Sequence, residues 1–217
     1  MSLKAIIDEY FPECYCKNRS EKVAIQSETT EKESFDLQDK KSDYIVNFGE
    51  GNASFRNYQK FSFDVLAYDG MIHGYGYVKS LHNLSPCDFI LFNESHSIIV
   101  FDEITSSKNG IVNLTKPLPD KHYSKFEKVE KQLADTITVL SKIEQVKAIL
   151  DKCKVKVCLC SYRLYTGEHN AKRAFGRANT TIDRETGENG AELSCPKINN
   201  SGFKYFRISH DHAYKLS

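Results

Sequence analysis

Two apolar runs separated by a short polar break constrain the fold of this chain most strongly. The first run covers Asp88 to Phe92 and the second Ser97 to Thr105, and the Asn-Glu-Ser-His sequence between them is typical of a turn. Because a short turn fixes the register of a hairpin, the runs predict an antiparallel pair of strands. In that pair Asp88 faces Asp102 or Glu103, so carboxylates from two strands meet at one open end of the sheet.

A long amphipathic helix is expected after the hairpin, from about Tyr123 to Cys153. Apolar side chains recur there close to the helical period, whereas Lys and Glu fill the opposite face. The apolar positions are Phe126, Val129, Leu133, Ile137, Leu140, Ile143 and Ile149. An apolar strand beginning at Val155 follows at once. A strand, a helix and a second strand predict a crossover connection packed on a mixed sheet.

Weaker signals place the remaining elements. Apolar residues at helical spacing predict a short helix from Leu3 to Phe11, which ends at Pro12. The polar and charged residues 20–42 are typical of a long loop or a weakly ordered insert, and residues 49–59 also indicate a loop. Short strands are expected at residues 43–48, 71–81 and 203–209. The sequence therefore predicts an α/β fold with a mixed central sheet flanked by helices.

The overall composition excludes few classes of function. The chain has 217 residues, with 30 Lys and Arg against 29 Asp and Glu, a balance that neither requires nor excludes a nucleic-acid partner. No apolar run is long enough to span a bilayer, and the start lacks the features of a signal peptide. We therefore expect a soluble, cytoplasmic protein that does not contact a membrane.

Seven cysteines, an odd number without an export signal, predict reduced thiols rather than disulfides. Cys158 and Cys160 alternate with Val157 and Leu159 in an apolar strand. They are expected to be small core residues rather than zinc ligands, because their spacing does not match that of a structural zinc site.

The carboxylates at the end of the hairpin indicate a metal site. An acid at a strand end is usually solvated, but acids gathered from two strands repel each other unless a cation neutralises them. Mg²⁺ binds one or two carboxylates together with water and phosphate oxygens, and it can promote attack of water on a phosphodiester. The predicted geometry therefore suits a metal-dependent nuclease.

The order of these features resembles the PD-(D/E)xK nuclease superfamily, whose fold is that of many restriction endonucleases. The matching parts are Pro86-Cys87-Asp88, then Asp102-Glu103-Ile104-Thr105, then the long helix and the strand after it, within about Met71 to Tyr165. The resemblance implies a restriction-endonuclease-like core and a Mg²⁺-dependent endonuclease that hydrolyses DNA. Asp88 and Glu103 would be catalytic and would bind the metal, and Gln132 would be a supporting polar residue.

The family lysine has no counterpart at its usual position. It should lie two residues after the second acid, where this chain has Thr105. We expect another cation to stabilise the developing phosphorane charge. Lys108 ranks first because it is nearest in sequence, Lys131 on the helix second, and Lys128 third.

A basic segment after the core could track phosphates. Lys172, Arg173 and Arg177 lie in a loop-rich region and are candidates for contacting the DNA backbone. Nearby acids dilute their charge, so an ordinary solvated loop is the favoured interpretation of this segment.

The domain organisation follows from these assignments. Residues 1–70 would form an N-terminal helix and irregular insert packed on the core, residues 71–165 the nuclease-like core, and residues 166–217 a loop-rich extension completing the domain. A homodimer is consistent with this organisation. Two other functions stay open: a catalytically inactive nuclease fold that binds nucleic acid or a protein partner, and a structural or interaction protein without a nucleic-acid role.

Overall fold

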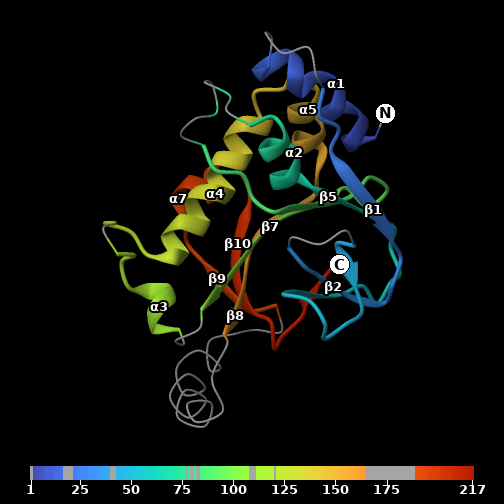
Figure 1. Ribbon diagram of the computed structural model, residues 1–217. Helices are drawn as coiled ribbons and strands as arrows, with labels where there is room; N and C mark the ends of the chain where they lie inside the picture. Colours follow the sequence, from blue (N-terminus) through green and yellow to red (C-terminus); the bar gives the residue numbers. More distant parts are fainter. Residues whose placement is uncertain are drawn as a thin grey trace.

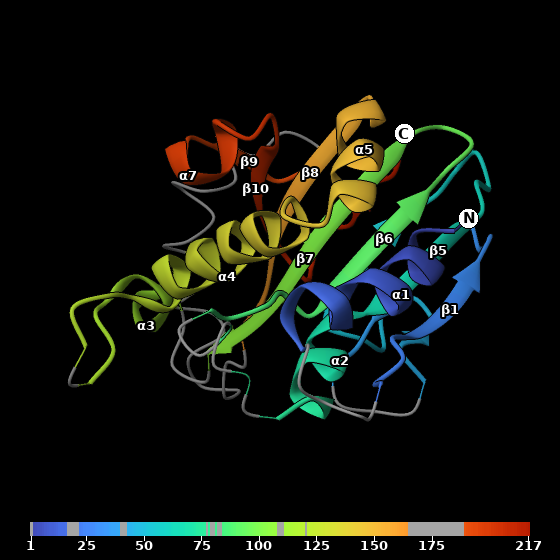
Figure 2. The ribbon, with the colours of Figure 1, turned by 90° about the horizontal axis from the view of Figure 1, so that it is seen from above.

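A computed structural model describes residues 2–16, 22–39, 43–76, 78, 81, 84–107, 111–119, 121–164 and 189–217. The chain forms an α/β fold around a mixed seven-stranded sheet, with helices on one face and a four-stranded sheet on the other (Figures 1 and 2). The strand order of the large sheet is β1-β5-β6-β7-β8-β10-β9. That of the small sheet is β11-β4-β2-β3.

The elements have the following bounds. The large sheet contains β1 (Gln26–Thr30), β5 (Phe63–Ala67), β6 (Phe89–Asn93), β7 (Ile98–Ser107), β8 (Val155–Leu164), β9 (Ala191–Leu193) and β10 (Lys204–Ser209). The small sheet contains β2 (Ser34–Leu37), β3 (Ile45–Val46), β4 (Ala53–Arg56) and β11 (Tyr214–Lys215). The helices are α1 (Leu3–Tyr15), α2 (Tyr68–Gly74), α3 (Val112–Thr115), α4 (Lys125–Leu140), α5 (Glu144–Lys152) and α7 (Pro196–Asn199).

The predicted hairpin and crossover are both present. β6 pairs antiparallel with β7, and β8 runs parallel to β7 after the chain has passed through α4 and α5. The expected strand at residues 203–209 is β10, which pairs parallel with β8. β3 lies within the strand expected at residues 43–48. The prediction of an α/β fold with a mixed central sheet and helices is confirmed, although the helices cover one face and the small sheet covers the other.

Both faces of the central strands of the large sheet are buried, which explains their nearly continuous apolar runs. Phe101, Cys158 and Cys160 belong to the core beneath the helices, whereas Val100 and Leu159 belong to the core beneath the small sheet. Side chains alternate along a strand, so Glu103 and Thr105 lie on the helix side with Phe101. Asp102 lies on the side of the small sheet.

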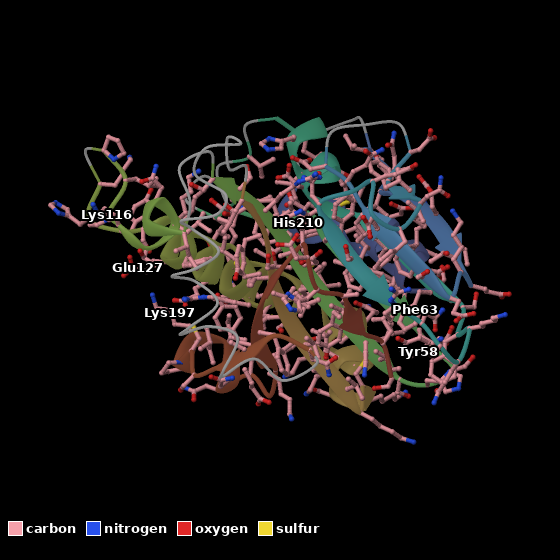
Figure 3. All side chains as sticks on the ribbon, turned by 90° about the horizontal axis from the view of Figure 1, so that it is seen from below. Tyr58, Phe63, Lys116, Glu127, Lys197 and His210 are labelled. Atoms are coloured by element: carbon pink, nitrogen blue, oxygen red, sulfur yellow. The ribbon has the colours of Figure 1, made fainter. Side chains whose placement is uncertain are left out.

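Helix α4 covers the central strands with the predicted apolar stripe. Its start is fixed by a capping box, in which Ser124 and Glu127 bond each other's backbone amides; Figure 3 shows Glu127 at this end of the helix. Phe126, Val129 and Leu133 are buried against the sheet.

The prediction of one helix from Tyr123 to Cys153 is wrong, because two helices occupy this segment. The chain leaves the helical conformation at Ile143, whose backbone is extended (φ −88°, ψ 107°) and whose side chain is fully buried. The bend turns α5 toward α1, with which it packs. The helix is therefore interrupted at this point, and the side chain of Ile143 is buried.

Four local predictions are also corrected. Residues 68–74 form helix α2 instead of the strand expected at residues 71–81, because Tyr68, Met71 and Tyr75 are buried together at helical spacing. The segment 20–42, expected to be a loop, contains β1 and β2, and the loop expected at 49–59 contains β4. Pro12 lies inside α1 and is buried there, so it does not end the helix.

The buried stripe of α4 should contribute strongly to stability. Leu133 is fully buried, so Leu133→Ala should lower the free energy of unfolding by about 2–5 kcal/mol through lost burial and the cavity left behind. Lys147→Ala, at an exposed position of α5, should change it by less than about 0.5 kcal/mol. Urea denaturation of both variants checks this. Equal effects would show that α4 is not packed as described.

Candidate active site

Two carboxylates meet at one end of the β6–β7 hairpin. Phe89 pairs with Asp102, so one further step in register places Asp88 opposite Glu103. The backbone N–H of Ile104 donates a 2.7 Å hydrogen bond to Asp88 Oδ2. In Figure 2 the start of β6 and the end of β7 lie beside α2 and the first turns of α4. The expectation that Asp88 faces Asp102 or Glu103 is thus confirmed.

Asp102 lies on the opposite face of the sheet. It is fully buried, and its Oδ1 accepts a 2.7 Å hydrogen bond from Ser161 Oγ. Burial raises the pKa of Asp102 to about 7, although the Ser161 bond lowers it. Of the two acids in the middle of β7, Glu103 therefore shares the face of Asp88.

Asp39 and Asp69 add negative charge to the site, and the sequence analysis missed both. The backbone N–H groups of Tyr68 and Asp69, at the start of α2, donate to the Asp88 carbonyl oxygen at 2.9 and 3.4 Å. Asp39 follows β2 of the small sheet. The charges of Asp39 and Asp69 both raise the pKa of Asp88. Each acid lies in or next to a segment for which the wrong secondary structure was expected, and this hid its proximity to the hairpin.

The carboxylates of the site are poorly compensated. Burial raises the pKa of Asp88 to about 8, against the lowering effect of the Ile104 bond, and the neighbouring acids add to the rise. The pKa of Glu103 is raised well above its usual value, first by burial and then by the charge of Asp88. Glu103 Oε2 is buried and accepts no hydrogen bond from any residue that the structure describes. A site of this kind favours either a proton or a bound cation.

The charge of Lys128 interacts with that of Glu103. This lysine is exposed on α4, and its positive charge lowers the pKa of Glu103. Lys131, which ranked above it, forms an ion pair with Asp135 on the same helix. Lys125 Nζ donates to the Ser106 carbonyl oxygen. Thr105 lies on the face of Glu103, as expected from its position two residues along β7.

Several predicted site residues lie outside the described part of the chain. They are Lys108, Lys172, Arg173 and Arg177. Gln132 is described, and its Nε2 donates to the carbonyl oxygen of Pro86, two residues before Asp88, at 3.2 Å. Gln132 Oε1 is buried without a hydrogen-bond partner among the described residues.

Within the described ranges, no group of three or more His, Cys, Asp or Glu side chains is arranged to hold a metal ion. Cys158 and Cys160 are buried free thiols, as predicted. None of the described helices has the length and apolar character needed to cross a membrane.

No family model matches this chain, and neither the curated proteins nor the solved structures include a significant match to it. The functional interpretation therefore depends on the geometry and electrostatics of the site.

The raised pKa of Asp88 predicts how stability depends on pH. Without metal, the folded protein retains a proton on Asp88 up to about pH 8, whereas an unfolded Asp loses it near pH 4. The folded state binds more protons between these values, so this residue makes the free energy of unfolding fall as pH rises through that window. At pH 5 Asp88→Asn should be close to wild type. At pH 8.5 it should be more stable by about 1–4 kcal/mol, because each pH unit of that window lowers the stability of the wild type by up to about 1.4 kcal/mol.

Urea denaturation in EDTA at both pH values measures this difference. Asp151→Asn is the matched control, since Asp151 is exposed on α5 and its loss should not change the pH dependence. An Asp88→Asn variant that is less stable than wild type at pH 8.5 would contradict the account of an uncompensated carboxylate.

Proposed function

We propose that this protein is a Mg²⁺-dependent endonuclease that hydrolyses phosphodiester bonds in DNA. One observation carries the proposal. Asp88 and Glu103 meet on one face of the sheet where β6 begins. Each is held at a raised pKa by burial, and the charge of Asp88 raises the pKa of Glu103 further. Perturbed acids grouped in this way are more frequent at functional sites than at structural ones.

The donors at the site fit Mg²⁺. Asp88 and Glu103 offer carboxylate oxygens, including the buried Glu103 Oε2 that no described residue bonds. Mg²⁺ commonly uses one or two protein carboxylates and takes its remaining ligands from water and substrate phosphate, so two acids are enough. When bound, Mg²⁺ would lower the pKa of a water molecule and offset charge on the phosphodiester.

Lys128 is the residue that we assign to the role of the missing family lysine. Its ammonium group would stabilise the negative charge that develops on the phosphate during attack, which the hydroxyl of Thr105 cannot do. The assignment is supported by the effect of Lys128 on Glu103 and by the pairing of Lys131 with Asp135. Lys108 remains a candidate from the sequence alone.

The order of elements also supports the proposal. An antiparallel hairpin carries the two acids, a helix crosses the sheet with Lys128 and Gln132 on it, and β8 then adds in parallel beside β7. This is the order that the resemblance to the PD-(D/E)xK superfamily implies. Thr105 favours the alternative of an inactive fold that only binds nucleic acid, so the test must separate binding from cleavage.

Incubation with supercoiled plasmid and with single-stranded DNA tests the activity. Wild type should cleave DNA in Mg²⁺ or Mn²⁺ and not in EDTA. Asp88→Asn and Glu103→Gln should each lose at least about 100-fold in rate, because transition-state charge is no longer offset. Asp151→Asn serves as the control and should cleave like wild type.

Four results would contradict this proposal. Cleavage that persists in EDTA would contradict the metal dependence, and cleavage that survives both substitutions would exclude these acids as the site. A mobility shift without cleavage would identify a nucleic-acid-binding protein instead. Neither binding nor cleavage would favour a structural or interaction protein.

The assignment of Lys128 has a separate test. Lys128→Ala should lower the cleavage rate roughly 100- to 1,000-fold, the usual effect of removing a group that stabilises transition-state charge. Lys147→Ala, which removes an exposed lysine from α5, should leave the rate unchanged. Single-turnover rates measured at saturating Mg²⁺ compare the two variants. A wild-type rate for Lys128→Ala would assign the role to another cation.

A further inference from the structure

The segment that leads into Asp88 is bound to helix α4 at three consecutive residues. The Ser85 backbone N–H donates to Asp135 Oδ2 at 3.0 Å. The Pro86 carbonyl oxygen accepts from Gln132 Nε2 at 3.2 Å. The Cys87 backbone N–H donates to Thr136 Oγ1 at 2.8 Å. We call the side chains of Gln132, Asp135 and Thr136 the α4 anchor.

Helix geometry brings the members of the α4 anchor together. Residues separated by three or four positions lie on one side of a helix, so the three side chains face the same backbone segment. Thr136 is fully buried, and its hydroxyl donates to the Gln132 carbonyl oxygen at 2.9 Å while accepting from Cys87. Asp135 also pairs with Lys131, which holds its carboxylate in place. Because each bond is made within the packed core or at its edge, the backbone of residues 85–87 has little freedom.

Asp88 itself is held on its other side by the sheet and by α2. Its carbonyl oxygen accepts from the N–H groups of Tyr68 and Asp69, and its Oδ2 accepts from Ile104. The α4 anchor thus fixes the chain immediately before Asp88, and these bonds fix Asp88 and its carboxylate. Removing the anchor would let the backbone of residues 85–87 move without changing the hydrogen bond of the Asp88 carboxylate.

We propose that Thr136 and Asp135 are positioning residues that set the metal affinity of the Asp88–Glu103 site by fixing the backbone at Ser85 and Cys87. The proposal rests on the metal-dependent function proposed above. It goes beyond the role that the family resemblance gives to Gln132, since neither Thr136 nor Asp135 belongs to the motifs of that resemblance. Groups that orient metal ligands from behind commonly change metal affinity roughly 10- to 100-fold when they are removed.

Thr136 and Thr138 provide a matched pair of substitutions. Thr138 is exposed on the same helix, and its hydroxyl donates to the Ala134 carbonyl oxygen at 2.9 Å, the same type of bond that Thr136 makes to Gln132. Thr136→Val and Thr138→Val each remove that bond and keep the side-chain shape. Thr136→Val additionally removes the acceptor for the Cys87 amide. Thr136→Ser keeps the acceptor.

Two measurements on the full chain test the proposal: amide hydrogen exchange at Cys87 by NMR, and the Mn²⁺ dissociation constant by calorimetry. Thr136→Val should lose protection at Cys87 and weaken Mn²⁺ binding roughly 10- to 100-fold. Thr136→Ser and Thr138→Val should behave like wild type in both. Should Thr136→Val fail to fold, Asp135→Ala, at the partly exposed end of the anchor, should weaken Mn²⁺ binding in the same direction.

The outcomes separate this proposal from the proposed function. Unchanged Cys87 protection in Thr136→Val overturns the anchoring, and lost protection with unchanged Mn²⁺ binding overturns the positioning role. Equal loss in Thr138→Val would also overturn it, because the cause would then be the helix. A wild type that binds no Mn²⁺ refutes the proposed function instead. Exchange at Cys87 then decides whether α4 anchors the segment.

Discussion

The pairing of β6 with β7 determines where the charged groups of this protein lie. With Phe89 opposite Asp102, Asp88 reaches Glu103 and accepts the Ile104 N–H bond. A shift of one residue would turn Glu103 toward the small sheet and Asp102 toward the helices. Because both faces of the strands are packed, Phe101 and Val100 would exchange cores at the same time. The apolar pattern of the hairpin therefore specifies the position of the acids.

The site opposes the stability of the fold that contains it. Apolar packing makes the central sheet stable, whereas Asp88 and Glu103 on its interior strands are partly or fully withdrawn from water beside further acids. A carboxylate without a functional role would have a lower free energy in water than in this buried position. Elsewhere in the described part of the chain, most carboxylates are exposed to water. Exceptions to this pattern are expected at functional positions. The α4 anchor belongs to the same arrangement, since it holds the backbone of the three residues that precede Asp88.

The sequence predicts those parts of the structure that depend on local information. The hairpin follows from its turn, the start and buried face of α4 from its apolar period, and the Asp88–Glu103 pair from the hairpin register. Contacts between distant segments were not predictable in this way. Asp39 and Asp69 reach the site only through the packing of the small sheet and of α2, and the end of α4 depends on the burial of Ile143. The sequence also contained a reason to rank Lys131 below Lys128 as the substitute for the family lysine. Lys131 and Asp135 are four residues apart, and such pairs interact on a helix.

The central claim is that Asp88 and Glu103 together bind a divalent cation. A crystal structure of the wild-type protein grown with Mn²⁺, with anomalous diffraction data, tests this claim most directly. We expect an anomalous peak bonded to carboxylate oxygens of both Asp88 and Glu103, and loss of that peak in crystals of Glu103→Gln. Mn²⁺ bound elsewhere, with both acids free of metal at saturating concentration, would contradict the account.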